Sequence, residues 1–275
     1  MKIDTHQHFW DLQKLDYPWM NPEQKVIYRN FYPSDLQSEL EANGVDGTVT
    51  VQATHSEAET EWLLSLARSN SFIKGVVGWL DLTAPDLSER LEKMLALGPL
   101  RGVRHQVHDE PDTEWLLQPA VVNGLRTLAK RDIPYDLLLR PPHLKVLPAL
   151  FEAVPDATWI IDHIAKPEIK AGIMEPWAED IRRASAYPNV YCKVSGIITE
   201  ADWANWSAAQ IRPYFEVVLE SFGPERLLFG SDWPVCLLAG SYSRVIQLVE
   251  ELIASLSEGE KNKIWFENAL RVYKL

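Results

Sequence analysis

The sequence predicts a single (β/α)8 barrel, the α/β fold also called a TIM barrel, over residues 1–275. Two patterns support this fold: short apolar runs alternate with longer amphipathic segments, and several runs are apolar on consecutive residues. Consecutive apolar residues are typical of parallel strands that helices cover on both faces. A length of 275 residues also suits one such barrel. A doubly wound open sheet is the main alternative, although no Gly-x-Gly-x-x-Gly follows a strand to support its nucleotide-binding form.

Eight runs have the length and composition of strands. Thr158-Trp159-Ile160-Ile161 and Leu227-Leu228-Phe229 are the most continuously apolar of them. The predicted strands cover residues 2–6, 47–53, 73–80, 100–105, 133–139, 158–163, 189–195 and 226–231.

Helical segments fall between these strands. Residues 34–37 and 56–59 read Ser-Asp-Leu-Gln and Ser-Glu-Ala-Glu, which are typical of capping boxes at helix starts. Gly44 and Gly98 stand where the first and third helices would end. Further helices are predicted near 86–97, 119–130, 142–153, 175–186, 207–222 and 241–256, and a last one near 259–272 would close the domain.

Residues 9–33 form the longest stretch without a clear element. Long loops in compact domains are often lids or binding loops. An irregular segment that only covers the barrel rim would have the same composition, so the sequence leaves the role of this segment open.

Composition narrows the classes of function. The net charge is −12, and no basic cluster exists, which argues against a nucleic-acid or anionic-membrane partner. No apolar stretch is long enough to span a membrane. Two distant cysteines, Cys192 and Cys236, predict reduced thiols. A strand that begins at residue 2 leaves no room for a signal peptide, so we expect a cytoplasmic protein.

Ionisable and polar residues gather at one end of the predicted strands. In a parallel barrel the catalytic groups stand at the carboxyl ends of the strands. In chain order, the residues at or near those ends are His6, His8, Gln52, Arg104, Asp136, His163, Lys193 and Asp232. Charge scattered over a surface would not produce this clustering, so we expect an active site there.

His6 and His8 lie two residues apart on a strand, so their side chains share one face. Two imidazoles placed in this way can reach one metal ion or one substrate. A structural reading, in which one histidine caps the strand and the other faces solvent, is about as plausible for the pair alone.

The other candidates also have structural explanations. Asp232 could cap the next helix, and His163 could bond a backbone carbonyl. Lys193 could extend out of the barrel. Arg104 could pair with a structural carboxylate, such as Asp136, and Gln52 could satisfy a loop. All of these explanations together would require coincidence at the same end of six or seven strands.

The chemistry of this set is hydrolytic. Asp232 can accept a proton from water, while imidazoles or a metal polarise a carbonyl. Arg104 or Lys193 can offset the negative charge that develops on oxygen. Covalent catalysis is disfavoured, because no Gly-x-Ser-x-Gly is suitably placed and neither cysteine has an adjacent histidine.

The chain resembles the amidohydrolase superfamily, and within it the group of sugar lactonases. The resemblance covers nearly the whole chain. The narrower motifs are the Asp-His-x-x-Lys-Pro string and the Gly-Ser-Asp-Trp-Pro string. The residues that carry the resemblance are Ile3-Asp4-Thr5-His6-Gln7-His8-Phe9-Trp10, Gly102-Val103-Arg104-His105, Asp136-Leu137-Leu138, Asp162-His163-Ile164-Ala165-Lys166-Pro167, Lys193-Val194-Ser195-Gly196, Gly230-Ser231-Asp232-Trp233-Pro234 and Asn268-Ala269.

The resemblance implies that Asp232 is the general base for water, that His163 and the two N-terminal histidines surround the scissile carbonyl or a metal, and that Arg104 contacts substrate. Two-metal members carry a bridging Lys or Glu on a middle strand, which this chain lacks, and strand five has no histidine. A single divalent metal, Zn²⁺ first, on His6, His8 and Asp232, with His163 as a further ligand, fits the residue types. Metal-free catalysis is the alternative.

We therefore expect an enzyme of carbohydrate catabolism that opens an aldonolactone derived from a sugar such as L-fucose or L-rhamnose. Catalysis would rest on Asp232, His163 and Arg104. Hydroxyl groups and ring faces of the substrate would meet Gln52, Arg104, Asp136, Lys193 and Trp233. A metal-dependent decarboxylase, a pyrone-dicarboxylate lactonase and an inactive sugar-binding barrel are the alternatives. The sequence also leaves a homodimer open.

Overall fold

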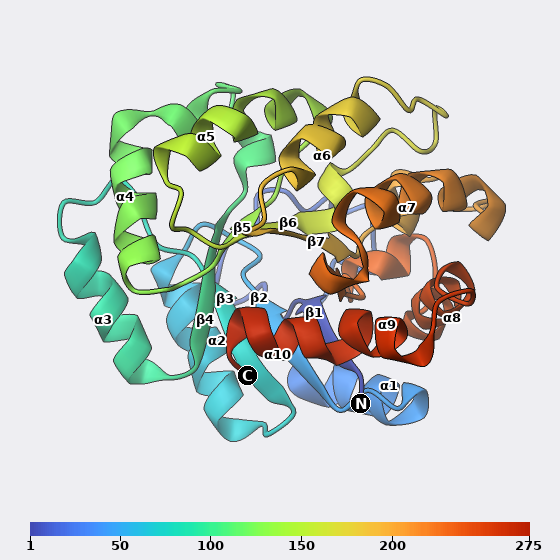
Figure 1. Cartoon of the computed structure of the whole chain (residues 1–275). Coiled ribbons are helices and arrows are strands. Elements are labelled where there is room, and N and C mark those ends of the chain that lie inside the picture. Colours follow the sequence, from blue (N-terminus) through green and yellow to red (C-terminus); the bar gives the residue numbers. More distant parts are fainter.

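Eight parallel strands form one sheet in the order β1 to β8, so the predicted barrel is confirmed and the open sheet is excluded. The computed structural model describes residues 1–275. Figure 1 shows the strands in the middle of the molecule and the helices around them. The strands are β1 (Ile3–Gln7), β2 (Gly47–Val51), β3 (Ile73–Gly78), β4 (Leu100–His105), β5 (Tyr135–Leu137), β6 (Trp159–Ile161), β7 (Val190–Val194) and β8 (Leu227–Phe229).

The two edges of the sheet meet beyond the regular ladder. The His8 amide donates to the Trp233 carbonyl at 2.7 Å, and the Asp232 amide donates to the His6 carbonyl at 2.7 Å. The Thr5 hydroxyl adds a bond of 2.6 Å to the Phe229 carbonyl. These contacts join β1 to the segment after β8, which brings the first and last predicted site residues together.

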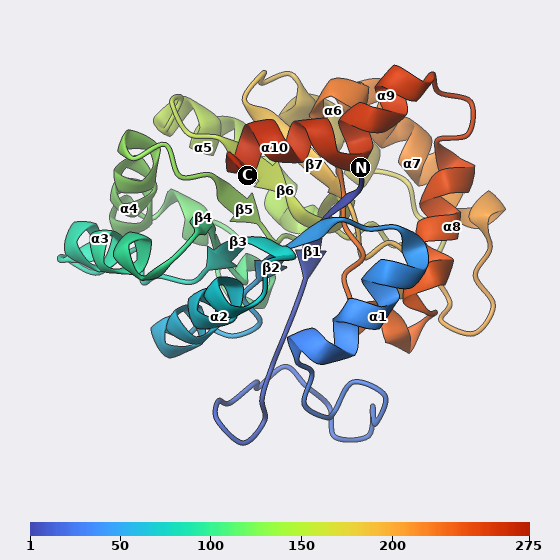
Figure 2. The ribbon, with the colours of Figure 1, turned by 90° about the horizontal axis from the view of Figure 1, so that it is seen from below.

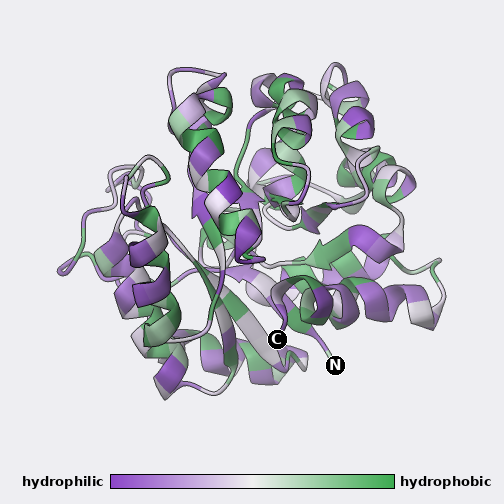
Figure 3. Cartoon of the chain, turned by 60° about the vertical axis from the view of Figure 1, so that its left-hand side comes forward, coloured by the Kyte–Doolittle hydropathy of each residue, from purple (hydrophilic) through white to green (hydrophobic).

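Helices follow the strands and cover the barrel. Their bands of hydrophobic and hydrophilic residues alternate along each helix in Figure 3, as expected when one face packs on a sheet. They are α1 (Pro33–Asn43), α2 (Glu57–Ser69), α3 (Leu87–Leu97), α4 (Pro119–Lys130), α5 (Leu147–Ala153), α6 (Trp177–Ser185), α7 (Ala208–Phe222), α8 (Tyr242–Leu252), α9 (Glu258–Asn262) and α10 (Asn268–Tyr273). No helix is long and apolar enough to cross a membrane.

Helix boundaries differ from the sequence prediction at several places, and the predicted helix 241–256 ends four residues early, at Leu252. Helix α1 starts two residues earlier than the predicted capping box, with Tyr32 at the N-cap and Asp35 accepting from the Tyr32 amide. Pro33 takes the first helical position, where its missing N–H costs nothing. The predicted helix 142–153 begins as a 3-10 helix at Pro141–Val146, and the predicted helix 259–272 is interrupted by a π-helical turn at Lys263–Glu267.

Two predicted helix signals gave different outcomes. Ser56 caps α2 as expected, because its hydroxyl accepts from the Glu59 amide. Glu59 does not complete the predicted capping box, because its carboxylate accepts from the Ala53 and Thr54 amides instead of the Ser56 amide. Gly44 ends α1 in the left-handed conformation, with φ of 63°, whereas Gly98 ends α3 with extended backbone.

The barrel interior is closed at its amino-terminal end by α10. The Tyr273 hydroxyl lies 2.9 Å from Asp136 Oδ2, inside the barrel. The interior apolar cluster combines side chains from the strands with three from α10: Ile3, Val49, Val51, Val77, Ile160, Leu228, Ala269, Val272 and Tyr273. A catalytic cavity can therefore open only at the carboxyl end of the strands.

Residues 9–33 extend from the carboxyl end of β1, and Figure 2 shows them at the end of the molecule opposite both chain termini. Trp10 and Phe31 pair by two backbone bonds of 2.9 and 3.1 Å, which holds the base of the segment together. The Trp19 indole N–H donates to the Ala53 carbonyl at 2.7 Å, just after β2. The segment is thus packed across the mouth of the barrel.

Candidate active site

An irregularity in β1 turns both N-terminal histidines toward the mouth of the barrel. The pairing register of β1 with β2 shifts between Asp4 and Gln7. Asp4 therefore reaches Tyr242 on α8 at 3.1 Å, while His6, two residues later, points to the other side of the strand. His6 and His8 share one face, as the sequence predicts.

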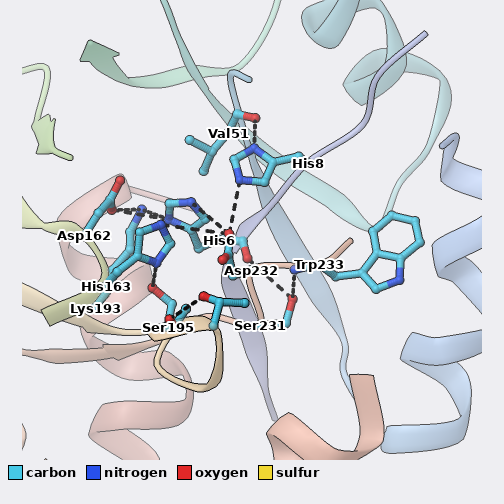
Figure 4. A network of polar contacts seen from close by, with 12 residues as sticks. His6, His8, Val51, Asp162, His163, Lys193, Ser195, Ser231, Asp232 and Trp233 are labelled. Carbon is cyan, nitrogen blue, oxygen red and sulfur yellow. Dashed lines mark hydrogen bonds and ion pairs between the residues drawn. The ribbon is translucent and has the colours of Figure 1, made fainter. Parts of the chain in front are cut away.

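Asp232 stands at the centre of the site. Its Oδ1 lies 3.4 Å from His8 Nε2, 3.9 Å from His6 Nε2 and 3.9 Å from His163 Nε2, and Figure 4 shows the imidazoles around this carboxylate. The residue has φ of 59°, a left-handed backbone conformation. Residues at the two ends of the chain therefore converge on one point.

His163 is held by the next strand. Its Nδ1 lies 2.9 Å from the Ser195 hydroxyl oxygen, and the ring packs directly over Gly196. A Cβ at Gly196 would come within 2.4 Å of His163 Nδ1, and φ of 58° there also requires glycine. Ser195 can donate to Nδ1, which leaves an Nε2–H that faces Asp232 and the cavity.

His8 and Asp232 form half of a cation site. His8 Nδ1 lies 2.7 Å from the Val51 carbonyl, so this nitrogen is the donor and Nε2 is left to face Asp232 Oδ1 at 3.4 Å. A proton or a metal ion can lie between these two atoms. With His6 they can hold a divalent metal.

Charged groups surround His6 on both ring nitrogens. Arg104 Nη1 lies 3.2 Å from His6 Nε2. Nδ1 faces Asp162 Oδ1 at 3.3 Å and Lys193 Nζ at 3.2 Å. Burial, together with Lys193 and Arg104, keeps the pKa of His6 well below its ordinary value despite Asp162. His6 is neutral.

A buried ion network continues below His6. Lys193 Nζ lies 2.5 Å from Asp136 Oδ2 and 3.1 Å from Asp162 Oδ1. Arg104 Nη1 adds a contact of 3.0 Å to Asp162 Oδ2. Burial alone would raise the pKa of Asp162, but Lys193, His6 and Arg104 hold it well below the ordinary value. Asp162 is therefore a permanent anion beneath the site.

Asp232 is also ionised, although it is buried. Burial would raise the pKa of Asp232, but His163, the contact with His8 and the Lys166 ammonium outweigh it, so the pKa lies below the ordinary value. The carboxylate can accept a proton at neutral pH.

A cavity of about 130 Å³ opens on these groups at the carboxyl end of the barrel. Four predicted site residues reach it, and seven residues that the sequence analysis did not select complete it. The lining consists of His8, Arg104, His163 and Asp232, with Trp19, Ala53, Gln106, His108, Leu138, Lys166 and Val235.

Four residues expected to contact substrate lie outside this cavity. Asp136 and Lys193 are fully buried and pair with each other below the cavity. Lys193 therefore does not extend out of the barrel, and Asp136 pairs with Lys193 rather than with Arg104. Gln52 is also fully buried and packs against Arg104, whose Nη2 lies 2.5 Å from the Gln52 carbonyl. Trp233 packs against aromatic rings of the 9–33 segment.

Sequence reasoning missed several residues that complete the site. Asp162 and Lys166 stand within the Asp-His-x-x-Lys-Pro string, and both follow β6. Lys166 has φ of 50° and is held by Glu200 at 2.7 Å. Gln106 follows β4 directly, where a polar residue could have been selected by the rule of strand ends. Trp19 is one of several tryptophans near predicted loops that suit the ring face of a sugar, and no local signal in the sequence distinguishes it from those that pack at the rim.

The comparisons with known proteins point to one family. A family model described as Amidohydrolase matches residues 3–275. The chain is 39% identical over 287 aligned residues to an L-fucono-1,5-lactonase of Burkholderia multivorans, with 100% of this chain and 96% of that relative covered.

Similar solved structures also belong to amidohydrolases. Two crystal structures of an amidohydrolase from Burkholderia multivorans share 36% identity with the chain and cover 100% of it, with 99% of each solved chain included. One contains bound HEPES and has a TM-score of 0.95, and the other contains bound zinc and has a TM-score of 0.94.

Proposed function

Because this chain belongs to the amidohydrolase family, we propose that it hydrolyses a sugar-derived lactone, with L-fucono-1,5-lactone as the first substrate to test. One observation carries the proposal: three imidazoles surround an ionised carboxylate, Asp232, on the wall of a small cavity. The 39% identity to a lactonase supports an ester as the bond that is cleaved.

Asp232 acts as the general base. Its ionised carboxylate accepts a proton from the attacking water and directs the oxygen at the ester carbonyl carbon. The same group then returns the proton to the ring oxygen that leaves, so the lactone opens to a hydroxy acid. The Asp232 backbone is fixed by its bond to the His6 carbonyl, which limits the positions of the carboxylate.

Arg104 and His163 stabilise the tetrahedral intermediate. Arg104 lines the cavity, and its guanidinium is held by Asp162, the Gln52 carbonyl and His6, so its charge is fixed before substrate arrives. His163 offers an N–H when Ser195 donates to its other nitrogen. Fixed donors aimed at a developing oxyanion are the largest contribution in many acyl-transfer enzymes.

We propose one Zn²⁺ as the metal, held by His6, His8 and Asp232, while His163 keeps its Nε2–H for the oxyanion and does not serve as the further ligand. The zinc-bound relative and the close approach of His8 Nε2 to Asp232 Oδ1 support this assignment. Bound zinc would lower the pKa of water and polarise the carbonyl. Arg104 donates to His6 Nε2 in this structure, so His6 could coordinate zinc through Nε2 only if Arg104 released that nitrogen.

A lactone suits this site better than an amide. The alkoxide of an ester leaves more readily than an amine, so one carboxylate, a few fixed donors and at most one metal are sufficient. The cavity of about 130 Å³ admits a small ring, and Trp19, Gln106 and His108 offer it an apolar face and hydrogen-bonding groups.

The test compares Asp232→Asn with wild type in a pH-indicator assay of L-fucono-1,5-lactone. Removing the base should lower kcat/KM by roughly 10²–10⁴-fold with unchanged circular dichroism. Asp156→Asn, at an exposed position, is the matched control and should keep the wild-type rate. A rate for Asp232→Asn within tenfold of wild type would refute the role of Asp232, and no turnover by wild type would refute the substrate.

The decarboxylase and pyrone-dicarboxylate readings are less well supported, because the 39% identical relative is a sugar lactonase. A catalytic protein is also favoured over an inactive sugar-binding barrel by the complete set of histidines around Asp232. Both cysteines are free and buried, which supports a reducing compartment such as the cytoplasm. A homodimer stays a prediction.

A further inference from the structure

A second, larger hollow adjoins the catalytic cavity. It has a volume of about 640 Å³, against about 130 Å³ for the cavity itself. Trp19 and Gln106 line both spaces, so the two adjoin at these residues. We call it the outer hollow; its walls are Lys14, Leu15, Asp16, Pro18, Trp19, Thr54, His55, Ser56, Gln106, Asp109 and Glu110.

Two buried polar side chains in the outer hollow have no protein partner. Gln106 and Thr54 are each 8% exposed. The Gln106 amide N–H bonds His55 and the Thr54 amide N–H bonds Glu59, but neither side chain hydrogen-bonds any group of the protein. A carboxamide and a hydroxyl, each donor and acceptor, are therefore free to bind hydroxyl groups of a ligand.

The charge of the outer hollow favours a neutral ligand. Asp16, Asp109 and Glu110 face it against one ammonium, that of Lys14. Burial, with the neighbouring His105, lowers the pKa of His55 to about 4, so His55 adds no positive charge at neutral pH. An anionic ligand would be repelled, whereas a polyhydroxylated neutral one would meet acceptors and the apolar face of Trp19.

From this geometry we infer that the outer hollow is a subsite for a second, neutral sugar unit attached to the lactone ring. The inner cavity takes the ring that reacts, and the attached unit binds Gln106, Thr54 and the face of Trp19. The substrate class is then a glycosylated aldonolactone, opened by the same Asp232 chemistry. This inference rests on the proposed function.

The test compares L-fucono-1,5-lactone with three galactosyl-L-fucono-1,5-lactones, linked at O2, O3 and O4. At least one of the three should be hydrolysed with kcat/KM about tenfold above that of the parent lactone, the gain expected from one or two new hydrogen bonds. The matching galacturonosyl lactone should show no gain, because its carboxylate faces Asp16, Asp109 and Glu110.

Thr54→Val tests the subsite directly, because it keeps the shape of the residue and removes the hydroxyl. The ratio of kcat/KM between the preferred galactosyl lactone and the parent lactone should fall about fivefold. Thr127→Val, on the exposed side of α4, is the matched control and should leave this ratio unchanged.

Calorimetric binding of the ring-opened acids separates this inference from the proposed function. If no lactone is turned over, the proposed function fails, and tighter binding of a galactosyl-L-fuconic acid than of L-fuconic acid, weakened by Thr54→Val, still supports the subsite. If the parent lactone is hydrolysed but all three galactosyl lactones react more slowly than it, the inference is overturned. It is also overturned if no galactosyl acid binds more tightly, or if Thr54→Val leaves the preference unchanged.

Discussion

At the scale of single residues, Lys193 forms ion pairs with two buried carboxylates. Its side chain has no exposed surface, and its ammonium contacts both Asp136 and Asp162. The sequence placed a charged residue on strand β7, but it could not tell a lysine that meets substrate from one that neutralises the interior. That distinction depends on how far the residue lies below the rim of the barrel.

Lys193→Met should therefore destabilise the protein strongly. The substitution leaves Asp136 and Asp162 buried with less positive charge, and breaking a buried ion pair in this way costs about 3–5 kcal/mol of unfolding free energy. Denaturant unfolding at pH 7 measures the loss. Lys145→Met, at an exposed position, should change the free energy of unfolding by less than about 0.5 kcal/mol. Equal effects of the two substitutions would contradict the assignment.

At the scale of elements, Glu59 joins the first turn of α2 to the end of β2. It accepts from the Ala53 and Thr54 amides, the residues that border the inner cavity and the outer hollow. Burial raises the pKa of Glu59 from 4.5 to about 8. The folded protein thus keeps a proton on this carboxyl that the unfolded chain releases.

This raised pKa predicts how stability changes with pH. Since the folded state binds the proton more tightly, the contribution of Glu59 to stability falls as the pH rises from about 4.5 to about 8, and stays constant above. Glu59→Gln removes this loss, so between pH 5 and 8 its stability relative to wild type should rise by about 3–5 kcal/mol. Glu61→Gln on the same helix serves as control. A difference between Glu59→Gln and wild type that does not change with pH would exclude the shifted pKa.

The sequence predicts the elements well where their pattern is regular. Seven strands lie inside the predicted segments, β1 extends one residue beyond its segment, and α4 has the predicted bounds. Two local irregularities of the strands and helices could not be predicted from the sequence. The register shift in β1 turns Asp4 and His6 to opposite sides, and the π-helical turn at Lys263–Glu267 divides the last predicted helix. Both depend on tertiary packing rather than on local preference.

At the scale of the whole molecule, binding a metal should raise thermal stability. A ligand that binds only the folded state at about 100 times its Kd adds about 2.7 kcal/mol. For a protein of this size the gain corresponds to a rise in Tm of roughly 5 °C. Chelator-treated protein should show this rise on adding Zn²⁺.

The variants decide whether the rise comes from the proposed site. His8→Gln should abolish it, because the variant removes one of three ligands. His55→Gln changes a histidine outside the ligand set and should keep it. A Tm that Zn²⁺ leaves unchanged in wild type, or raises equally in His8→Gln, would argue against metal at this site.

The site was predictable to the extent that it follows the fold. In a parallel barrel, catalytic groups stand at the carboxyl ends of the strands. This rule selected Arg104, His163 and Asp232, which lie more than a hundred positions apart from first to last in the sequence, and all three line the cavity. The rule does not report depth within the barrel, so residues under the rim were grouped with those that face the cavity. Contributions from the 9–33 segment, such as Trp19, depend on loop geometry that no periodicity encodes.

The alternating charges of Arg104, Asp162, Lys193 and Asp136 run from the floor of the cavity toward Tyr273 at the closed end of the barrel. Most of the barrel interior is apolar, so these four groups create a strong local electric field that water does not screen. Because each group is locked by its neighbours, the field is already in place before turnover and little reorganisation energy is needed when negative charge appears on the substrate.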